Sequence, residues 1–146
     1  MTVIAYRDGV VAADSQETMW DGRIQQCTKL FKVNDSIVCT AGDSYTGLIY
    51  LEWYKKGANP EYIPDLSMVD ISEDFECLVI EKENIYTINR FFQSYEIEMT
   101  EGFFALGCGA GYAMAAMEMG ANAKEAVRVA IKYDAYCGGK IQTIKC

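Results

Sequence analysis

The chain has 146 residues, an ordinary apolar content of 51% and a net charge of −8. This length suits one domain with a sizeable core, and the acidic balance argues against nucleic acid or an anionic membrane as the main partner, since both require basic patches. The sequence contains no histidine, which excludes Ser-His-Asp and Cys-His catalysis and the usual zinc and iron sites. Any catalysis must use a carboxylate, Lys, Tyr, Cys or the chain's own α-amine.

The six cysteines, at positions 27, 39, 77, 108, 137 and 146, form no C-x-x-C pair. A zinc ribbon or a thioredoxin motif is therefore not expected. The first residues lack the basic and apolar regions of a signal peptide, and no apolar run approaches the ~18 residues of a membrane span. These features predict a cytoplasmic protein with mostly reduced thiols and no membrane partner.

The first third of the chain is predicted to be mainly strands. Residues 2–6 and 10–14 form a strand pair around Asp8-Gly9, a typical hairpin turn. Residues 15–26 are predicted as a loop or irregular strand, and residues 29–33 and 36–40 as a second hairpin.

A helix is predicted next, capped by Asp43 or Ser44 and ended by Gly57, with Leu48, Leu51 and Tyr54 on one stripe. Residues 59–74 contain both prolines and are predicted as a connector with one short helical turn.

The second half begins with a predicted third hairpin, residues 76–80 and 84–89, followed by a strand pair of residues 91–98 and 103–107. Two helices are expected after the glycine-rich GCGAG, the first stopped by Gly120 and the second over residues 123–133. A final strand covers residues 140–144. This order of elements predicts an α+β protein of one domain over residues 1–146, with two antiparallel sheets and helices on their outer faces.

Five stretches, in this order along the chain, carry a family resemblance: TVIAYRDGVVAADSQ, the KLF of CTKLFKVND, IVCTAGD, LGCGAGYA and DAYCGG. In these stretches the chain resembles the proteasome β-type family of N-terminal nucleophile hydrolases, particularly bacterial HslV-type peptidases and their short phage-encoded relatives. The resemblance covers nearly the whole chain and implies a four-layer αββα sandwich. Residues 59–74 match least, because the family usually has a second full helix there, so the helical layer is expected to be reduced.

The resemblance makes Thr2 the candidate nucleophile, once Met1 has been removed. A threonine hydroxyl needs a base, and a free α-amine on the same residue, with a pKa of about 8 in unstructured chains, can serve in a protein without histidine. The alternative is that Thr2 is only the first polar residue of a strand.

Asp14 and Lys29 match the family's catalytic carboxylate and lysine. The Lys29 ammonium would keep the Thr2 amine neutral, and Asp14 would orient and partly neutralise Lys29 in a poorly solvated pair. Alternatively, both are surface charges at strand ends. A two-residue Asp8-Gly9 loop would set Val3 opposite Asp14, whereas a three-residue bulged loop would set Thr2 opposite Asp14. The catalytic interpretation favours the bulged loop or an irregular strand end.

The resemblance also implies an oxyanion hole made of backbone N–H groups. Its position corresponds to Cys39, where the family has glycine, and Gly42 is a second candidate. The family's two serines near the nucleophile's amine are replaced by Cys108 and Cys137, while Asp134 is retained. These cysteines could sustain weaker proton transfer, could bind a metal or be oxidised, or could simply be small core residues. No cofactor and no metal are expected.

The leading functional hypothesis is an N-terminal threonine peptidase acting on peptides or unfolded proteins. The resemblance further implies a homo-oligomeric ring and a ring ATPase of the AAA+ unfoldase type as partner. The alternative is a non-catalytic proteasome-like subunit with an assembly or binding role, suggested by the three cysteine departures. A third, weaker hypothesis is hydrolysis of small-molecule amides at a more open site.

Overall fold

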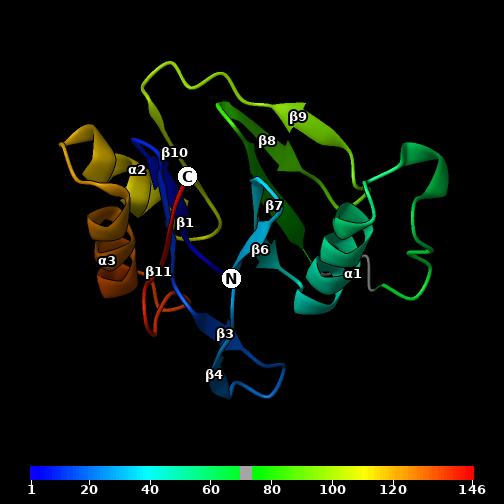
Figure 1. The fold of residues 1–146 in the computed structure, drawn as a ribbon. Coiled ribbons are helices and arrows are strands. Elements are labelled where there is room, and N and C mark those ends of the chain that lie inside the picture. Colours follow the sequence, from blue (N-terminus) through cyan, green and yellow to red (C-terminus); the bar gives the residue numbers. More distant parts are fainter. Residues whose placement is uncertain (70–73) are drawn as a thin grey trace. The chain divides into compact units, whose positions relative to one another are not determined.

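The computed structural model describes residues 1–69 and 74–146 (Figure 1). The chain is α+β with antiparallel sheets, which confirms the predicted class. It divides into two compact units, one made of Met1–Phe31 and Glu98–Cys146 and the other of Lys32–Ile97. That the chain is one functional domain stays a prediction. Among the helices of the described ranges, none is both long and apolar enough to cross a membrane.

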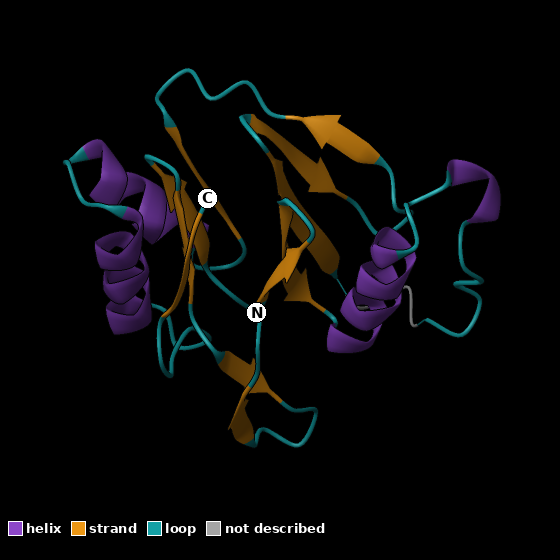
Figure 2. Cartoon of the chain, viewed as in Figure 1, coloured by secondary structure: helices purple, strands orange, loops and turns teal. Residues whose placement is uncertain are grey.

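The first unit contains a four-stranded antiparallel sheet of order β10-β1-β2-β11, with helices α2 and α3 packed against it (Figure 2). A two-stranded ribbon, β3-β4, replaces the predicted loop or irregular strand. The elements are β1 (Ile4–Arg7), β2 (Val10–Ala13), β3 (Gln16–Thr18), β4 (Ile24–Gln26), β10 (Phe103–Leu106), α2 (Ala110–Glu118), α3 (Ala123–Tyr133) and β11 (Gln142–Lys145).

Small side chains dominate the core between this sheet and its helices. Ala5 and Ala12 of the strands pack with Ala126 and Ala130 of α3, all fully buried. Helix α3 begins with a capping box, in which Asn122 and Glu125 each bond the other's backbone N–H. The small residues allow helix and sheet to approach closely, so the strand ends that carry Thr2 and Asp14 rest on a rigid support.

The turn of the first hairpin differs from the one that the catalytic interpretation favoured. Asp8 and Gly9 have φ values of 50° and 73°, as a two-residue type I′ turn requires. Arg7 pairs with Val10, and the Asp14 N–H donates to the Val3 carbonyl at 3.2 Å. The bulged loop was therefore the wrong expectation: Val3, not Thr2, lies opposite Asp14.

The second unit contains most of a five-stranded sheet of order β5-β6-β7-β8-β9, whose strands β6 to β9 pair antiparallel. Helix α1 packs on β6 and β7. Its first turn is capped by Asp43, whose carboxylate accepts the Thr46 N–H. The elements are β5 (Leu30–Val33), β6 (Ser36–Gly42), α1 (Ser44–Lys55), a 3-10 turn η1 (Pro60–Tyr62), β7 (Phe75–Glu81), β8 (Asn84–Ile88) and β9 (Ser94–Glu96).

Two expectations, one for helix α1 and one for the strands after residue 90, were wrong in part. Leu48 is 57% exposed, and α1 buries Tyr50 and Leu51 together with the small residues of its first turn. The strand predicted over residues 91–98 shrinks to β9, which pairs with β8, while β10 pairs with β1. The predicted turn in the connector is η1; residues 70–73 of that connector lie outside the described residues.

Candidate active site

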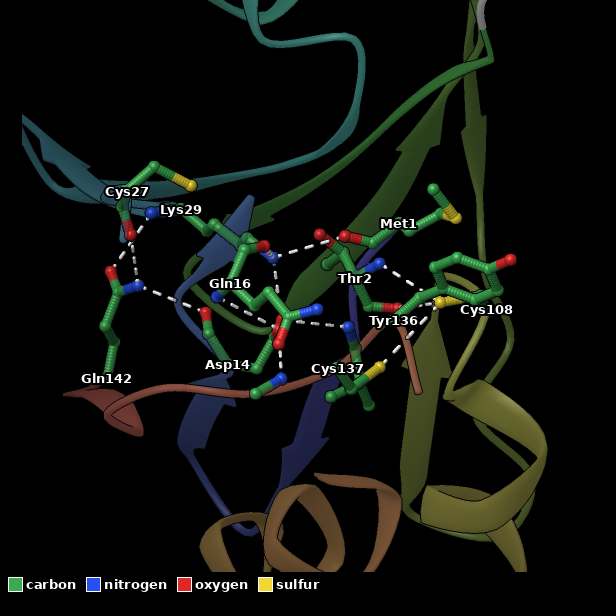
Figure 3. Close-up of polar contacts among 12 residues, drawn as sticks. Met1, Thr2, Asp14, Gln16, Cys27, Lys29, Cys108, Tyr136, Cys137 and Gln142 are labelled. Atoms are coloured by element: carbon green, nitrogen blue, oxygen red, sulfur yellow. Dashed lines mark hydrogen bonds and ion pairs between the residues drawn. The ribbon is translucent and has the colours of Figure 1, made fainter. Parts of the chain in front are cut away.

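Asp14 is the centre of a buried polar cluster in the first unit (Figure 3). It follows β2 directly, and its side chain is fully buried. One carboxylate oxygen, Oδ1, accepts the Val3 N–H at 3.1 Å and the Lys29 ammonium at 2.8 Å. The other, Oδ2, accepts the backbone N–H groups of Gln16 and Gly138 at 3.2 and 3.0 Å. Four donors therefore compensate for the desolvation of the carboxylate.

Lys29 is equally enclosed, with a side chain only 5% exposed. Its ammonium donates to Asp14 Oδ1 at 2.8 Å, to the Gln16 carbonyl at 2.7 Å and to the Met1 carbonyl at 3.4 Å. These acceptors match the three N–H groups of an ammonium. The third acceptor belongs to the peptide bond that joins Met1 to Thr2, so Lys29 lies directly beside the candidate nucleophile.

Thr2 is 1% exposed and is held at its backbone. Its N–H donates to Cys108 Sγ at 3.2 Å, and its carbonyl accepts the Gly109 N–H at 3.2 Å. At Gly107, whose φ is +95°, an added Cβ would lie 2.2 Å from the Thr2 carbonyl oxygen. The glycine of this loop therefore permits a backbone approach that any side chain would block.

Cys108, Asp134 and Cys137 gather on the Thr2 side of the cluster. The two sulfurs are 3.7 Å apart, and all three ligand-type atoms lie within 4.8 Å of one another. Asp134 ends α3 and accepts the Tyr136 N–H at 2.8 Å, which shapes the turn carrying Cys137. The hydrogen bond from the Cys137 thiol lowers the pKa of Cys108 to about 7. The same bond, aided by burial, raises the pKa of Cys137.

Sequence reasoning missed Gln142, which joins β11 to Asp14 and to the stretch that contains Cys27 and Lys29. Its Nε2 donates to the Asp14 and Cys27 carbonyls at 3.1 and 2.9 Å, and its Oε1 accepts the Lys29 N–H at 3.0 Å. No local pattern marks this residue. Gly138 was also missed as a donor to Asp14, although the Gly-Gly of DAYCGG was a signal: a Cβ at Gly138 would lie 2.2 Å from Gln16 Oε1.

The two candidate oxyanion residues belong to the second unit. Cys39 is fully buried within β6, opposite Leu78. Gly42 ends this strand with φ +85°, and a Cβ there would lie 1.9 Å from the Asp74 carbonyl oxygen. The packing of β6 against its neighbours accounts for the buried cysteine at position 39 and for the glycine at position 42. Their role as oxyanion donors stays a prediction.

The fold is similar to known proteasome-type structures over its whole length. HslV from Trypanosoma brucei matches with a TM-score of 0.71 and 17% identity, over 99% of both chains. BPH from Thiobacillus denitrificans matches with a TM-score of 0.68 and 21% identity, over 98% of this chain and 95% of that one. The complex of BPH with epoxomicin matches with a TM-score of 0.62 and 20% identity, over 98% of this chain and 96% of that one. By sequence, no family model and no curated protein matches the chain.

These similarities show that the chain has an HslV-like fold, as its sequence motifs predicted. The first unit brings Thr2, Asp14 and Lys29 into one buried cluster, with Cys108, Asp134 and Cys137 beside it.

Proposed function

We propose that the chain is an N-terminal threonine peptidase whose nucleophile is Thr2, exposed by removal of Met1. The observation that carries the proposal is the position of the Lys29 ammonium, which is fixed by Asp14 and reaches the Met1–Thr2 peptide bond at 3.4 Å. A buried charge beside the N-terminal peptide bond is costly unless it is compensated. Such an arrangement is therefore typical of a functional site.

Removal of Met1 changes two groups at once. The Thr2 nitrogen becomes a free amine that can accept a proton. Lys29 loses its contact with the Met1 carbonyl, while Asp14 and the Gln16 carbonyl still hold two of its three N–H groups. The third N–H is then free to interact with Thr2, and the positive charge favours the neutral form of the amine.

The reaction proceeds by acyl transfer. The Thr2 amine takes the proton of the Thr2 hydroxyl as Oγ1 attacks the peptide carbonyl, and then gives this proton to the leaving amine. An ester of Thr2 remains. Water attacks the ester, with the amine again serving as base, and releases the carboxylic acid and free Thr2. The family resemblance, and no contact described above, assigns the stabilisation of the oxyanion to backbone N–H groups at Cys39 and Gly42.

Cys108 and Cys137 are proposed to relay protons around the Thr2 amine, with Asp134 fixing the turn of Cys137. Cys108 Sγ lies 3.2 Å from the Thr2 nitrogen. A thiol is a weaker hydrogen-bond partner than a hydroxyl, so we expect slower turnover than a serine-containing site would support.

The proposed substrates are peptides or unfolded proteins, and the proposed assembly is a homo-oligomeric ring served by an AAA+ unfoldase in the cytoplasm. These assignments rest on the family resemblance, and the free cysteines fit a reducing compartment. The solution mass tests the assembly: a ring has a mass several times that of one chain, which is 16.3 kDa before Met1 is removed.

Peptide hydrolysis by three matched chains tests the proposal. The wild type and Thr2→Ser retain a hydroxyl and should hydrolyse a peptide panel, whereas Thr2→Val keeps the shape, lacks the nucleophile and should be inactive. Intact mass must confirm in each case that Met1 is absent. Equal turnover by wild type and Thr2→Val would refute the proposal.

The second candidate function is a non-catalytic proteasome-like subunit. Two thiols stand where the family has serines, and in the Met1-containing chain the Thr2 nitrogen is an amide that cannot act as a base. Retention of Met1 on the purified protein, together with ring formation, would favour this alternative.

A further inference from the structure

We propose that Cys108, Cys137 and Asp134 form a binding site for a thiophilic divalent cation such as Zn²⁺, and that the bound ion inhibits Thr2. The site itself stands on the geometry of these three residues. Only the inhibition rests on the proposed peptidase function.

The spacing of the sulfurs fits a tetrahedral ion. Two thiolates at the usual zinc–sulfur distance of about 2.3 Å and a tetrahedral angle lie about 3.8 Å apart. Cys108 Sγ and Cys137 Sγ are 3.7 Å apart. Binding would release the thiol protons to solvent, and little movement of either side chain is needed.

Asp134 supplies the third ligand. One of its carboxylate oxygens lies within 4.8 Å of both sulfurs, and the Tyr136 N–H that donates to Oδ1 at 2.8 Å holds the side chain in place. Two thiolates and one carboxylate form a donor set that suits Zn²⁺ and disfavours Mg²⁺ or Ca²⁺.

The loops that carry the ligands are already fixed. Cys108 lies between two glycines, of which Gly107 abuts the Thr2 carbonyl and Gly109 the side chains of Val3 and Cys137. On the other loop, the Cys137 N–H donates to the Asp134 carbonyl at 3.2 Å. Cys108 is exposed, so an ion can enter from solvent. A site held in this way loses little entropy on binding.

The fourth ligand would be the Thr2 amine of the processed chain. The Thr2 nitrogen is 3.2 Å from Cys108 Sγ, close to the separation of two atoms that share one ion. A metal-bound amine has no lone pair to accept the hydroxyl proton. The ion would therefore block the base of the proposed peptidase without touching the Thr2 hydroxyl.

The test is titration of the reduced protein, otherwise complete but lacking Met1, with Co²⁺, whose thiolate complexes absorb light, followed by displacement with Zn²⁺. The wild type and the control Cys146→Ser should bind one ion per chain. Cys108→Ser and Cys137→Ser should lose the absorption band, and Asp134→Asn should bind about tenfold more weakly. A thiol count on each sample confirms that the cysteines are reduced.

Hydrolysis, measured on the same samples, separates the two proposals. If the ion binds and hydrolysis is absent with or without it, the site stands and the peptidase proposal fails. If peptides are hydrolysed but the reduced wild type binds no ion, or binds it as well in Cys108→Ser as in Cys146→Ser, the metal site is refuted.

Discussion

Lys29 Nζ lies 2.8 Å from Asp14 Oδ1, with both side chains nearly inaccessible to solvent. A pair of this kind costs several kcal/mol to desolvate, so replacing it by apolar residues is often neutral or stabilising. A contribution to the stability of the fold is therefore a weak explanation for the presence of the Lys29–Asp14 pair. The same ammonium contacts the Met1 carbonyl at 3.4 Å, and the proposed function gives this contact a chemical role.

Asp14→Asn should destabilise the protein by about 3–5 kcal/mol, because it leaves the buried Lys29 charge without its counterion. Urea unfolding measures the change. The control is Glu52→Gln, which breaks the exposed Lys55–Glu52 pair at 2.9 Å and should cost less than about 1 kcal/mol. Similar losses for the two variants would contradict the buried-pair description.

Gly107→Ala should destabilise the chain by about 2 kcal/mol or more, because the new Cβ meets the Thr2 carbonyl and the backbone is left-handed there. Gly111→Ala is the matched control: it lies in α2 with open space around the added atom, so it should stabilise by up to about 1 kcal/mol. Thermal unfolding of both variants checks whether their changes in stability relative to the wild type have opposite signs.

Gln142→Met should lower the free energy of unfolding by about 2–4 kcal/mol. The substitution removes the hydrogen-bond partner of two carbonyls and one N–H around Asp14 and Lys29. The control is Gln25→Met, at an exposed residue that donates a surface hydrogen bond to Glu17. Its free energy of unfolding should stay within about 0.5 kcal/mol of that of the wild type. A Gln142 variant as stable as the Gln25 variant would show that the bridge is dispensable.

Cys108 should be the first cysteine to react with iodoacetamide. Its pKa is lowered to about 7, so its thiolate accumulates as the pH rises through this value. Burial raises the pKa of Cys146 above 9.0, so its thiolate forms only at higher pH. Mass mapping after short labelling at pH values between about 6 and 9 gives both profiles. A Cys108 profile that coincides with that of Cys146 would contradict the thiol–thiol hydrogen bond.

The family resemblance implied that Thr2, Asp14 and Lys29 come together and that Cys108 and Cys137 lie near Thr2. These residues do meet in one unit. The turn of the first hairpin could also be predicted, because Asp8-Gly9 favours the two-residue type I′ form. The bulged loop was preferred on the assumption that Asp14 must face Thr2, whereas Lys29 makes the connection.

Features that depend on distant parts of the chain could not be predicted. Gln142 lies 128 residues from Asp14 in sequence, and a polar residue in a terminal strand carries no signal of its own. The buried face of helix α1, though not the helix itself, was misjudged because α1 has apolar residues on several sides. Its buried face includes Gly47, where a Cβ would come within 3.3 Å of Thr40, a contact that the apolar pattern does not reveal. Strand β9 is only three residues long and all three are exposed, so its sequence has no apolar alternation that would identify a partner strand.

The most direct test of the central claim is to locate the adduct of a threonine-reactive inhibitor on the purified protein by mass spectrometry. Epoxomicin, found in complex with the structurally similar BPH, is a suitable probe. We expect one adduct per chain, on an N-terminal peptide that begins at Thr2 and lacks Met1. A chain that begins at Thr2 and yet remains unlabelled there, or one that keeps Met1 on every copy, would contradict the claim.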